Sequence, residues 1–356
     1  MSDAPPWETT YVAVIAGGSG SRFWPISRPE QPKQLLDLFG DGPMLRKTIE
    51  RLSSVVPVER VLVVTNTEIG DRVRSILPEL PGENILEEPL GRNTAPAIAW
   101  AAALVERRHP GALLAVLPAD HHILPVDTFQ EDVCLALKTA REGYVVTIGI
   151  PPTRPETGYG YIRVGESLSA GVARASGFFE KPDVGTALRY LEAGDYLWNG
   201  GMFFASAKVF IEELRTFEPA MMAAIEPLAD HPTPASVDAT YRTLSSISID
   251  YAVMERSDKV AVVPARFGWS DVGSWNALYA FREEGETSYH RGAVVEMEGE
   301  GNVLYAEGGA IAAVGLNDMI VVHTPQATLV CPRHMAQRVR EAQQQIERLN
   351  RGETAP

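Results

Sequence analysis

A stretch of glycine and small residues between residues 16 and 34 also contains two cations. Its sequence is AGGSGSRFWPISRPEQPKQ. Glycines and serines let backbone amides approach a ligand closely, and Arg22 and Lys33 add positive charge in the same segment. In a chain with a net charge of −14, this local charge predicts a phosphate-binding loop. The predicted contacts are Gly17, Gly18, Ser19, Gly20, Ser21, Arg22 and Lys33.

The spacing of the glycines excludes two common nucleotide-binding motifs. The segment contains no G-x-x-x-x-G-K-[ST], so it is not a P-loop. Phe23 stands where the dinucleotide motif requires its third glycine, which argues against a dinucleotide oxidoreductase. The loop therefore indicates another kind of phosphate site.

A second polar segment, LPADHHI at residues 117–123, follows an apolar run that is typical of a buried strand. Asp120 comes directly after that run in a loop. A carboxylate in this place suits Mg²⁺, which prefers oxygen ligands and takes few of them from protein. His121 and His122 raise the alternative of zinc, but adjacent residues rarely both reach one ion. We predict a magnesium ligand at Asp120.

The loops that carry these residues need a scaffold of alternating strands and helices. Strands are predicted at residues 11–15, 60–65, 84–86, 112–117 and 145–148, with helices between them at 44–52, 66–77, 93–107 and 128–141. This alternation predicts an α/β fold, a Rossmann-like three-layer domain with a mixed, mostly parallel sheet. Ligands bind beyond the carboxyl ends of strands in such sheets, where the loops after Ile15 and Leu117 lie.

The pattern changes towards the end of the chain. From about Arg291, short apolar runs recur every eight to eleven residues and are separated by Gly, Asn and Asp. This spacing predicts a small β-rich module, for which a β-helix-like stack is one arrangement, and a terminal helix follows. We predict a catalytic domain over residues 1–285 and a C-terminal β module over residues 286–356.

Composition narrows the classes of function. The chain has a net charge of −14 and a pI of about 5. This balance argues against a general nucleic-acid-binding protein, which would need a basic face. No apolar run is long enough to span a membrane, and the first residues do not resemble a secretory signal. We expect a cytoplasmic protein. Cys134 and Cys331 indicate neither a disulfide framework nor a metal site.

The loop at residues 16–34 resembles the signature loop of a known family. The pattern G-G-x-G-[ST]-R-x-x-P…P-K is similar to that of the sugar-phosphate nucleotidyltransferases, and GGSGSRFWPISR…PKQ resembles the mannose-1-phosphate guanylyltransferase branch. Ser21 and Phe23 replace the more usual Thr and Leu. Similar motifs follow in the family's order from about residue 12 to 281. The resemblance implies that GTP and mannose 1-phosphate react to give GDP-mannose and pyrophosphate.

The resemblance also implies a sugar-phosphate site. In the family, a motif similar to FFEKPD at residues 178–183 contacts the sugar phosphate, which implies that Lys181 binds the phosphate and Glu180 the sugar hydroxyls. Asn199 lies in a turn similar to the family's sugar-binding turn. Gly158 and Tyr159, in TGYGY, complete the expected site. A segment similar to GWSDVGSW supplies a second metal carboxylate in the family, which implies that role for Asp271.

The segment EEPLGRNTAPAIAWAA at residues 87–102 resembles a run that lies near the nucleotide base in the guanylyltransferase branch. Guanine presents two adjacent donors, and a carboxylate only accepts hydrogen bonds. We therefore hypothesise that Glu88 selects guanine, although backbone carbonyls could do the same. Asn93 and Thr94 are expected at the nucleotide, and both are also typical helix caps.

The implied reaction needs no general base. A phosphate monoester has its second pKa near 6, so the attacking oxygen is already largely ionised. Catalysis must then consist of positioning and charge neutralisation. Asp120 and Asp271 would hold Mg²⁺, Arg22 would stabilise the pyrophosphate, Lys33 the α-phosphoryl group, and Lys181 the sugar phosphate.

Two alternatives remain at this stage. The same chemistry could act on another pair of substrates, such as glucose 1-phosphate with UTP or dTTP. A regulatory subunit could bind a nucleotide sugar without turnover. The β-rich tail is a candidate surface for a homodimer.

Overall fold

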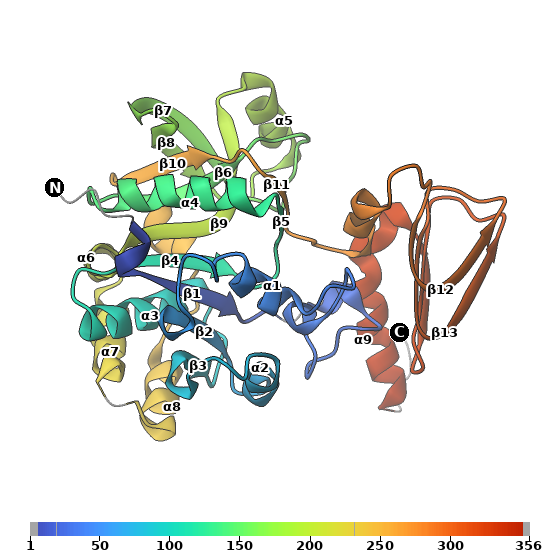
Figure 1. The fold of residues 1–356 in the computed structure, drawn as a ribbon, viewed down its shortest axis with the longest axis horizontal. Coiled ribbons are helices and arrows are strands. Elements are labelled where there is room, and N and C mark those ends of the chain that lie inside the picture. The colour runs from blue at the N-terminus through green and yellow to red at the C-terminus, as the bar shows by residue number, and fades with distance from the viewer. Residues whose placement is uncertain (1–5, 19, 231, 352–356) are drawn as a thin grey trace. The chain divides into compact units, whose positions relative to one another are not determined.

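Figure 1 shows the protein as a computed structural model that describes residues 6–18, 20–230 and 232–351. The chain divides into two compact units, each built from separate stretches of sequence. The first unit contains the chain up to Gly17, Leu45–Ala119 and Ile123–Trp269. The second unit contains Gly18–Met44, Asp120–His122 and the chain from Ser270. The division at residue 286 that the sequence suggests stays a prediction.

A nine-stranded mixed sheet forms the centre of the first unit. Its strands lie in the order β3 (Ile85–Glu88), β2 (Val61–Asn66), β1 (Thr10–Ala16), β4 (Leu113–Pro118), β9 (Tyr196–Ser206), β6 (Val145–Ile150), β10 (Val260–Pro264), β8 (Val172–Phe179) and β7 (Tyr161–Ser169). The first four strands are parallel, whereas β9 runs antiparallel to both of its central neighbours. The predicted mixed α/β sheet is confirmed.

The strands and helices of this unit form where their sequences favour them. Nearly every residue of β1 is buried, as expected of a parallel strand that is covered on both faces. Helix α3 (Thr94–Arg108) is also largely buried, with eleven buried residues. Its start is fixed by Asn93, whose side chain accepts a hydrogen bond from the backbone N–H of Thr94 at 2.9 Å. Such a cap satisfies one of the free donors at a helix start.

The remaining helices are short to medium in length. They are α1 (Met44–Glu50), α2 (Gly70–Ile76), α4 (Val126–Ala140), α5 (Val184–Ala193), α6 (Ala207–Phe217), α7 (Pro219–Ile225) and α8 (Pro234–Thr243), with a single π-helical turn η7 (Asp250–Met254). Two short strands, β5 (His122–Leu124) and β11 (Gly268–Ser270), form a separate two-stranded sheet. Within the described part of the chain, none of the helices has the length and apolar character needed to span a lipid bilayer.

The second unit contains the predicted β-rich module. Strands β12 (Tyr289–Met297), β13 (Val303–Val314) and β14 (Met319–His323) are parallel and follow one another without intervening helices, and β15 (Thr328–Pro332) pairs antiparallel with β14. The helix α9 (Val339–Asn350) ends the described chain. The pairing of β12 with β13 is irregular at Gly292, which has φ +83°. A Cβ atom there would come within 2.1 Å of the Ala306 carbonyl oxygen, so the position requires glycine.

One hydrophobic core joins the glycine-rich loop to this module. The Trp275 ring packs against Phe23 of the loop and Tyr305 of β13, with ring centroids 5.2 Å apart in both pairs. The Trp275 indole N–H also donates to the Trp24 carbonyl oxygen at 2.9 Å. Further members of the core are Ile26, Leu36, Leu38, Val272, Leu278, Val303, Ile320 and Val339. The loop that the sequence assigns to phosphates therefore folds around side chains from the end of the chain.

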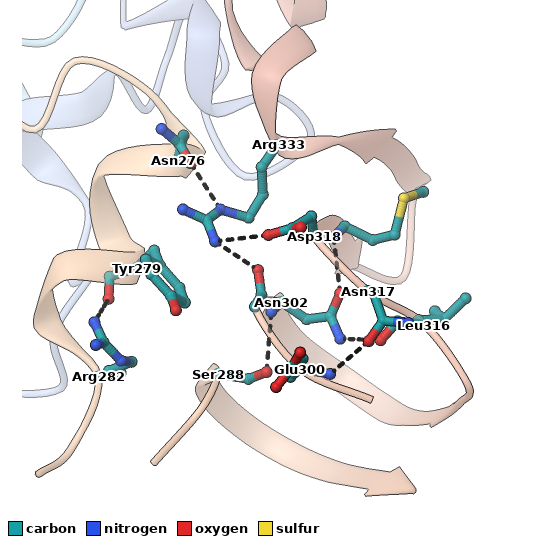
Figure 2. A network of polar contacts seen from close by, with 12 residues as sticks. Asn276, Tyr279, Arg282, Ser288, Glu300, Asn302, Leu316, Asn317, Asp318 and Arg333 are labelled. Carbon is teal, nitrogen blue, oxygen red and sulfur yellow. Dashed lines mark hydrogen bonds and ion pairs between the residues drawn. The ribbon is translucent and has the colours of Figure 1, made fainter. Parts of the chain in front are cut away.

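A polar network fixes the short helix η8 (Trp275–Phe281) to the same module (Figure 2). The Arg333 guanidinium donates to the Asn276 side chain at 2.9 Å and to the Gly301 carbonyl at 2.8 Å. It also stacks on the Tyr279 ring, 3.6 Å from the centroid, and pairs with Asp318 at 3.3 Å. Because η8 begins shortly after Asp271, this network restrains the segment that carries the aspartate.

Candidate active site

The ends of β1 and β4 lie side by side where the chain leaves the first unit. The Ala119 amide donates to the Ile15 carbonyl at 3.1 Å, and the Thr65 hydroxyl donates to the Ala16 carbonyl at 3.1 Å. In the strand order β3-β2-β1-β4, the connections reverse direction at β1 and β4. The carboxyl ends of strands at such a switch point are where open α/β sheets bind ligands.

The glycine-rich loop makes close backbone contact with Lys33. Gly20 adopts φ +59°, and a Cβ atom there would lie 2.5 Å from the Lys33 amide nitrogen. Only glycine fits this conformation without strain. The Gln34 side chain also donates to the Gly18 carbonyl at 3.1 Å. Ser21 begins a short 3₁₀ turn, η2 (Ser21–Phe23). Ser19 lies outside the described residues, and its predicted role stays a prediction.

Lys33 contacts two other predicted residues, Asp120 and Asp271. Its ammonium group lies 2.8 Å from Asp120 Oδ2 and also donates to the backbone carbonyl of Asp271. The Lys33 side chain is only 7% exposed. Burial alone would raise the pKa of the Asp120 carboxyl, but the charge of Lys33 and its hydrogen bond hold that pKa below its usual value. Lys33 therefore links Asp120 and Asp271 in one compact cluster.

The donor set of this cluster suits Mg²⁺. Asp120 and Asp271 offer oxygen ligands, and Mg²⁺ usually takes one or two carboxylates from protein and completes its shell with water and substrate phosphates. The Asp271 carboxylate lies over Gly273, where a Cβ atom would come within 2.8 Å of Oδ2. Among the described residues, no three His, Cys, Asp or Glu side chains are grouped to hold a metal ion.

The two histidines beside Asp120 take part in other contacts. The His122 ring packs between Phe39 and Phe281, with centroids 4.6 and 4.4 Å away. His121 is buried. These aromatic contacts give His122 a packing role that does not depend on a metal.

Arg22 and Lys33 contact different residues. Its guanidinium donates to the Gln337 side chain at 3.3 Å, close to the start of α9. No hydrogen bond or ion pair joins Arg22 to Asp120 within the described residues. Its role at the pyrophosphate stays a prediction, and the contact with Gln337 could not be predicted because 315 residues separate the two positions.

Glu88 is a buried carboxyl at the end of β3 in the first unit. It is 5% exposed, and its Oε1 atom has no hydrogen-bond partner within the described residues. Burial raises the pKa of Glu88 to about 7, opposed by the nearby Tyr241 hydroxyl. A Cβ atom on Gly17 would lie 3.9 Å from Glu88 Oε2. A buried acceptor without a partner is uncommon in native proteins and calls for an explanation, such as a missing ligand.

Asn93 and Thr94 hold structure at the start of α3. In addition to the Asn93 cap, the Thr94 hydroxyl accepts a hydrogen bond from the Ile249 amide at 2.9 Å. Asn93 thus has the capping role that its residue type allows, whereas the Thr94 hydroxyl connects the start of α3 to Ile249. Their predicted contact with the nucleotide stays a prediction.

The residues of the predicted sugar-phosphate site lie close together in the first unit. Lys181 pairs with Glu180 at 3.0 Å, and its backbone amide donates to the Tyr159 carbonyl at 3.2 Å. The Asn199 backbone N–H donates to the Gly160 carbonyl at 2.8 Å. Hydrogen bonding to Glu180 raises the pKa of Lys181, so this amine stays protonated. Gly158 lies in the same stretch, and its amide donates to Glu156 at 3.0 Å.

The structure adds one residue that we did not single out from the sequence. Asp250 accepts a hydrogen bond from the Asn199 side chain at 2.9 Å. Burial and the neighbouring charge of Glu180 raise the pKa of Asp250 to about 6. The available signal was the acidic residue between the apolar residues of SIDYAVM at residues 248–254.

Comparisons with known proteins show what most of the chain is similar to. The model of the nucleotidyl transferase family matches residues 12–288, and that of the "MannoseP isomerase/GMP-like beta-helix domain" matches residues 292–346. The chain is 42% identical to mannose-1-phosphate guanylyltransferase ManC of Salmonella typhimurium strain LT2 over 351 residues, and 42% identical to mannose-1-phosphate guanylyltransferase of Escherichia coli K12 over 354 residues. Each alignment covers 95% of this chain and 73% of the relative.

A solved structure resembles both parts of the chain. It is a crystal structure from Thermus thermophilus, described as a mannose-1-phosphate geranyltransferase, with a TM-score of 0.86 and 38% identity. The match covers 95% of this chain and 99% of that one.

Proposed function

Because the chain belongs to the nucleotidyl transferase family, we propose that it transfers the guanylyl group of GTP to mannose 1-phosphate, giving GDP-mannose and pyrophosphate. The names of the relatives at 42% identity support both substrates. The observation that carries the chemistry is the buried Lys33 ammonium, which contacts Asp120 and Asp271 beside a glycine-rich loop. Such a cluster is suited to phosphoryl groups and to a divalent cation.

The residues of the second unit act on the nucleotide in this proposal. The attacking phosphate of mannose 1-phosphate is already ionised at neutral pH, so the enzyme must mainly neutralise and orient charge. Lys33 neutralises the α-phosphoryl group, Arg22 the departing pyrophosphate, and the loop amides donate to phosphate oxygens. Asp120 and Asp271 would hold Mg²⁺, which supplies further charge neutralisation when bound.

The residues of the first unit recognise the base and the sugar phosphate. Glu88 accepts hydrogen bonds from guanine, with Asn93 and Thr94 at the nucleotide. Lys181 binds the sugar phosphate, and Glu180 and Asn199 bind sugar hydroxyls, with Gly158 and Tyr159 at their side. The protonated amine of Lys181 supports this role, because opposite charge attracts the phosphate.

The two alternatives have less support. Relatives named for mannose 1-phosphate and guanylyl transfer do not favour glucose 1-phosphate with UTP or dTTP. A regulatory subunit without turnover would have no need of the full set of Arg22, Lys33, Asp120 and Asp271, which this chain keeps.

The reaction can be tested by measuring pyrophosphate release with each of four nucleoside triphosphates and with the 1-phosphates of mannose, glucose and galactose. We expect GTP with mannose 1-phosphate to give the highest kcat/KM and to require a divalent cation. Preference for another pair would replace the substrates in the proposal, and no release with any pair would reject the activity.

Replacing Glu88 with Gln should weaken the preference for GTP over UTP by roughly tenfold or more, the size of a lost hydrogen bond to a charged group. The amide places a donor opposite the guanine donors. Guanine binding also favours the ionised carboxylate, so with a pKa of about 7 the wild-type KM for GTP should fall as pH rises from 6 to 8. The Glu88→Gln enzyme should lose this part of the pH dependence.

The neighbouring residue provides a matched control for this measurement. Glu87 pairs with Arg74 at 2.7 Å, so Glu87→Gln removes a carboxylate from the same strand and should leave base preference unchanged. An unchanged GTP to UTP ratio in Glu88→Gln would remove the guanine assignment.

We also propose a cytoplasmic homodimer. A cytoplasmic location gives access to GTP, and the β module offers exposed apolar side chains, namely Val295, Met297, Val314 and Val330. Exposed apolar patches often mark interfaces, and Met297 and Val314 are paired neighbours on β12 and β13. A monomer at micromolar concentration in sedimentation equilibrium would contradict the dimer.

A further inference from the structure

Most hydrogen-bonding positions of the Asn199 side-chain amide are already used by neighbouring residues. Its Oδ1 atom accepts from the Thr147 hydroxyl and from the Gly201 amide, both at 3.1 Å. Its Nδ2 atom donates to Asp250 Oδ1 at 2.9 Å. A carboxamide has two acceptor sites and two N–H donors. Three of the four are therefore used inside the first unit, and one N–H remains for a ligand.

We propose that Asp250 is a positioning residue of the sugar-phosphate site, which holds the Asn199 amide so that it can only donate a hydrogen bond to one sugar hydroxyl. This inference rests on the proposed function, because it assumes that Asn199 binds the sugar. It assigns a direction to the contact: the hydroxyl must accept from Asn199 and donate elsewhere.

A nearby carboxylate is available to accept a hydrogen bond from that hydroxyl. Glu180 lies over Gly160, where a Cβ atom would come within 2.5 Å of Glu180 Oε2 and 3.3 Å of Asn199 Cβ. The absence of a side chain at Gly160 thus lets Glu180 approach Asn199. A carboxylate only accepts hydrogen bonds. One donor from Asn199 and one acceptor from Glu180 together suit a hydroxyl, which both donates and accepts.

The position of Asp250 is set independently of its partner Asn199. Asp250 opens the π-helical turn η7, and the residue before it, Ile249, is held by the Thr94 hydroxyl. The charged groups near its carboxyl are Glu180, which is repulsive, and Lys181, which is attractive. Burial with a like charge nearby is costly unless the carboxyl has hydrogen-bond partners. Asn199 donates to Asp250 at 2.9 Å, and a hydrogen bond with the Ser248 side chain also favours the charged carboxylate.

The test compares KM values for the two substrates in Asp250→Ala, with turnover of the wild type measured first. The KM for mannose 1-phosphate should rise roughly tenfold, the scale of one hydrogen bond, whereas the KM for GTP should change by less than about twofold. An interaction that binds substrate and transition state equally alters KM rather than kcat. Asp238→Ala is the matched control, because that aspartate pairs with Arg242 on the surface of α8.

Deoxy sugars identify the hydroxyl. The 2-, 3-, 4- and 6-deoxy forms of mannose 1-phosphate should each be measured with the wild type and with Asp250→Ala. One analogue should carry a penalty in the wild type that shrinks severalfold in the variant, while the penalties of the other analogues stay the same. Equal penalties in both enzymes would overturn the proposal, as would a parallel rise in the KM for GTP.

Two further variants separate positioning from folding. Asp250→Asn keeps an acceptor for the Asn199 amide and should restore KM for mannose 1-phosphate to near the wild-type value. Thr147→Val removes a donor to Asn199 Oδ1 and should weaken the same deoxy penalty. An Asp250→Asn enzyme as poor as Asp250→Ala would reject positioning. A wild type without turnover would reject the proposed function instead.

Discussion

Replacement of Asp120 or Asp271 with Ala is expected to lower turnover of GTP and mannose 1-phosphate by roughly a hundredfold or more, because interactions with developing charge contribute on that scale. Both carboxylates belong to residues that Lys33 contacts. If they hold Mg²⁺, each variant should also need a higher Mg²⁺ concentration for half-maximal turnover. Pyrophosphate release over a Mg²⁺ titration measures both effects.

The control for these variants is a carboxylate of the same unit with no place in the cluster. Glu341 is 57% exposed and pairs with Arg338, so Glu341→Ala removes a carboxylate but should leave the Mg²⁺ dependence unchanged. Near-wild-type turnover in the double variant Asp120→Ala with Asp271→Ala would reject the metal assignment.

The second large effect is expected at Lys33. Lys33→Met should lower turnover by roughly a hundredfold or more, because it removes a cation that neutralises the α-phosphoryl group. It should also raise the pKa of Asp120, since the Lys33 ammonium, together with His121, holds that pKa down against burial. An acceptor left without its partner destabilises the fold by about 1–3 kcal/mol. Steady-state kinetics and denaturant unfolding measure the two effects.

A double variant separates catalysis from folding. In Lys33→Met the Asp120 carboxylate loses its cation, and adding Asp120→Asn removes that unpaired charge. The free energy of unfolding should therefore recover while turnover stays low. Recovery of turnover together with stability would show that Lys33 serves the fold rather than the reaction.

Local patterns predicted much of the first unit. The buried apolar runs of β1 and β4 and the Asn93 cap of α3 follow from short stretches of sequence, because burial on both faces and helix capping depend on neighbouring residues. The antiparallel place of β9 between β4 and β6 depends on pairing between distant segments. It could not be derived from periodicity alone.

In the candidate site, too, some features could be predicted from local sequence and others depend on distant segments. The residue types of Lys33, Asp120 and Asp271 suggested a shared task, and the structure brings these three together. The partner of Asn199 lies 51 residues away in the sequence. Contacts at that separation are determined by tertiary packing, which a single sequence does not show.

The shared core of the glycine-rich loop and the β module limits how such an enzyme can be rearranged. A gene that ended near residue 288, where the transferase family match stops, would encode Phe23 and Trp275 without Tyr305, Ile320 and Val339, which complete their packing. The module therefore cannot be exchanged between enzymes as an independent cassette. Recombination or chimera design must transfer residues 18–44 and 270–339 together, because they were fitted to each other.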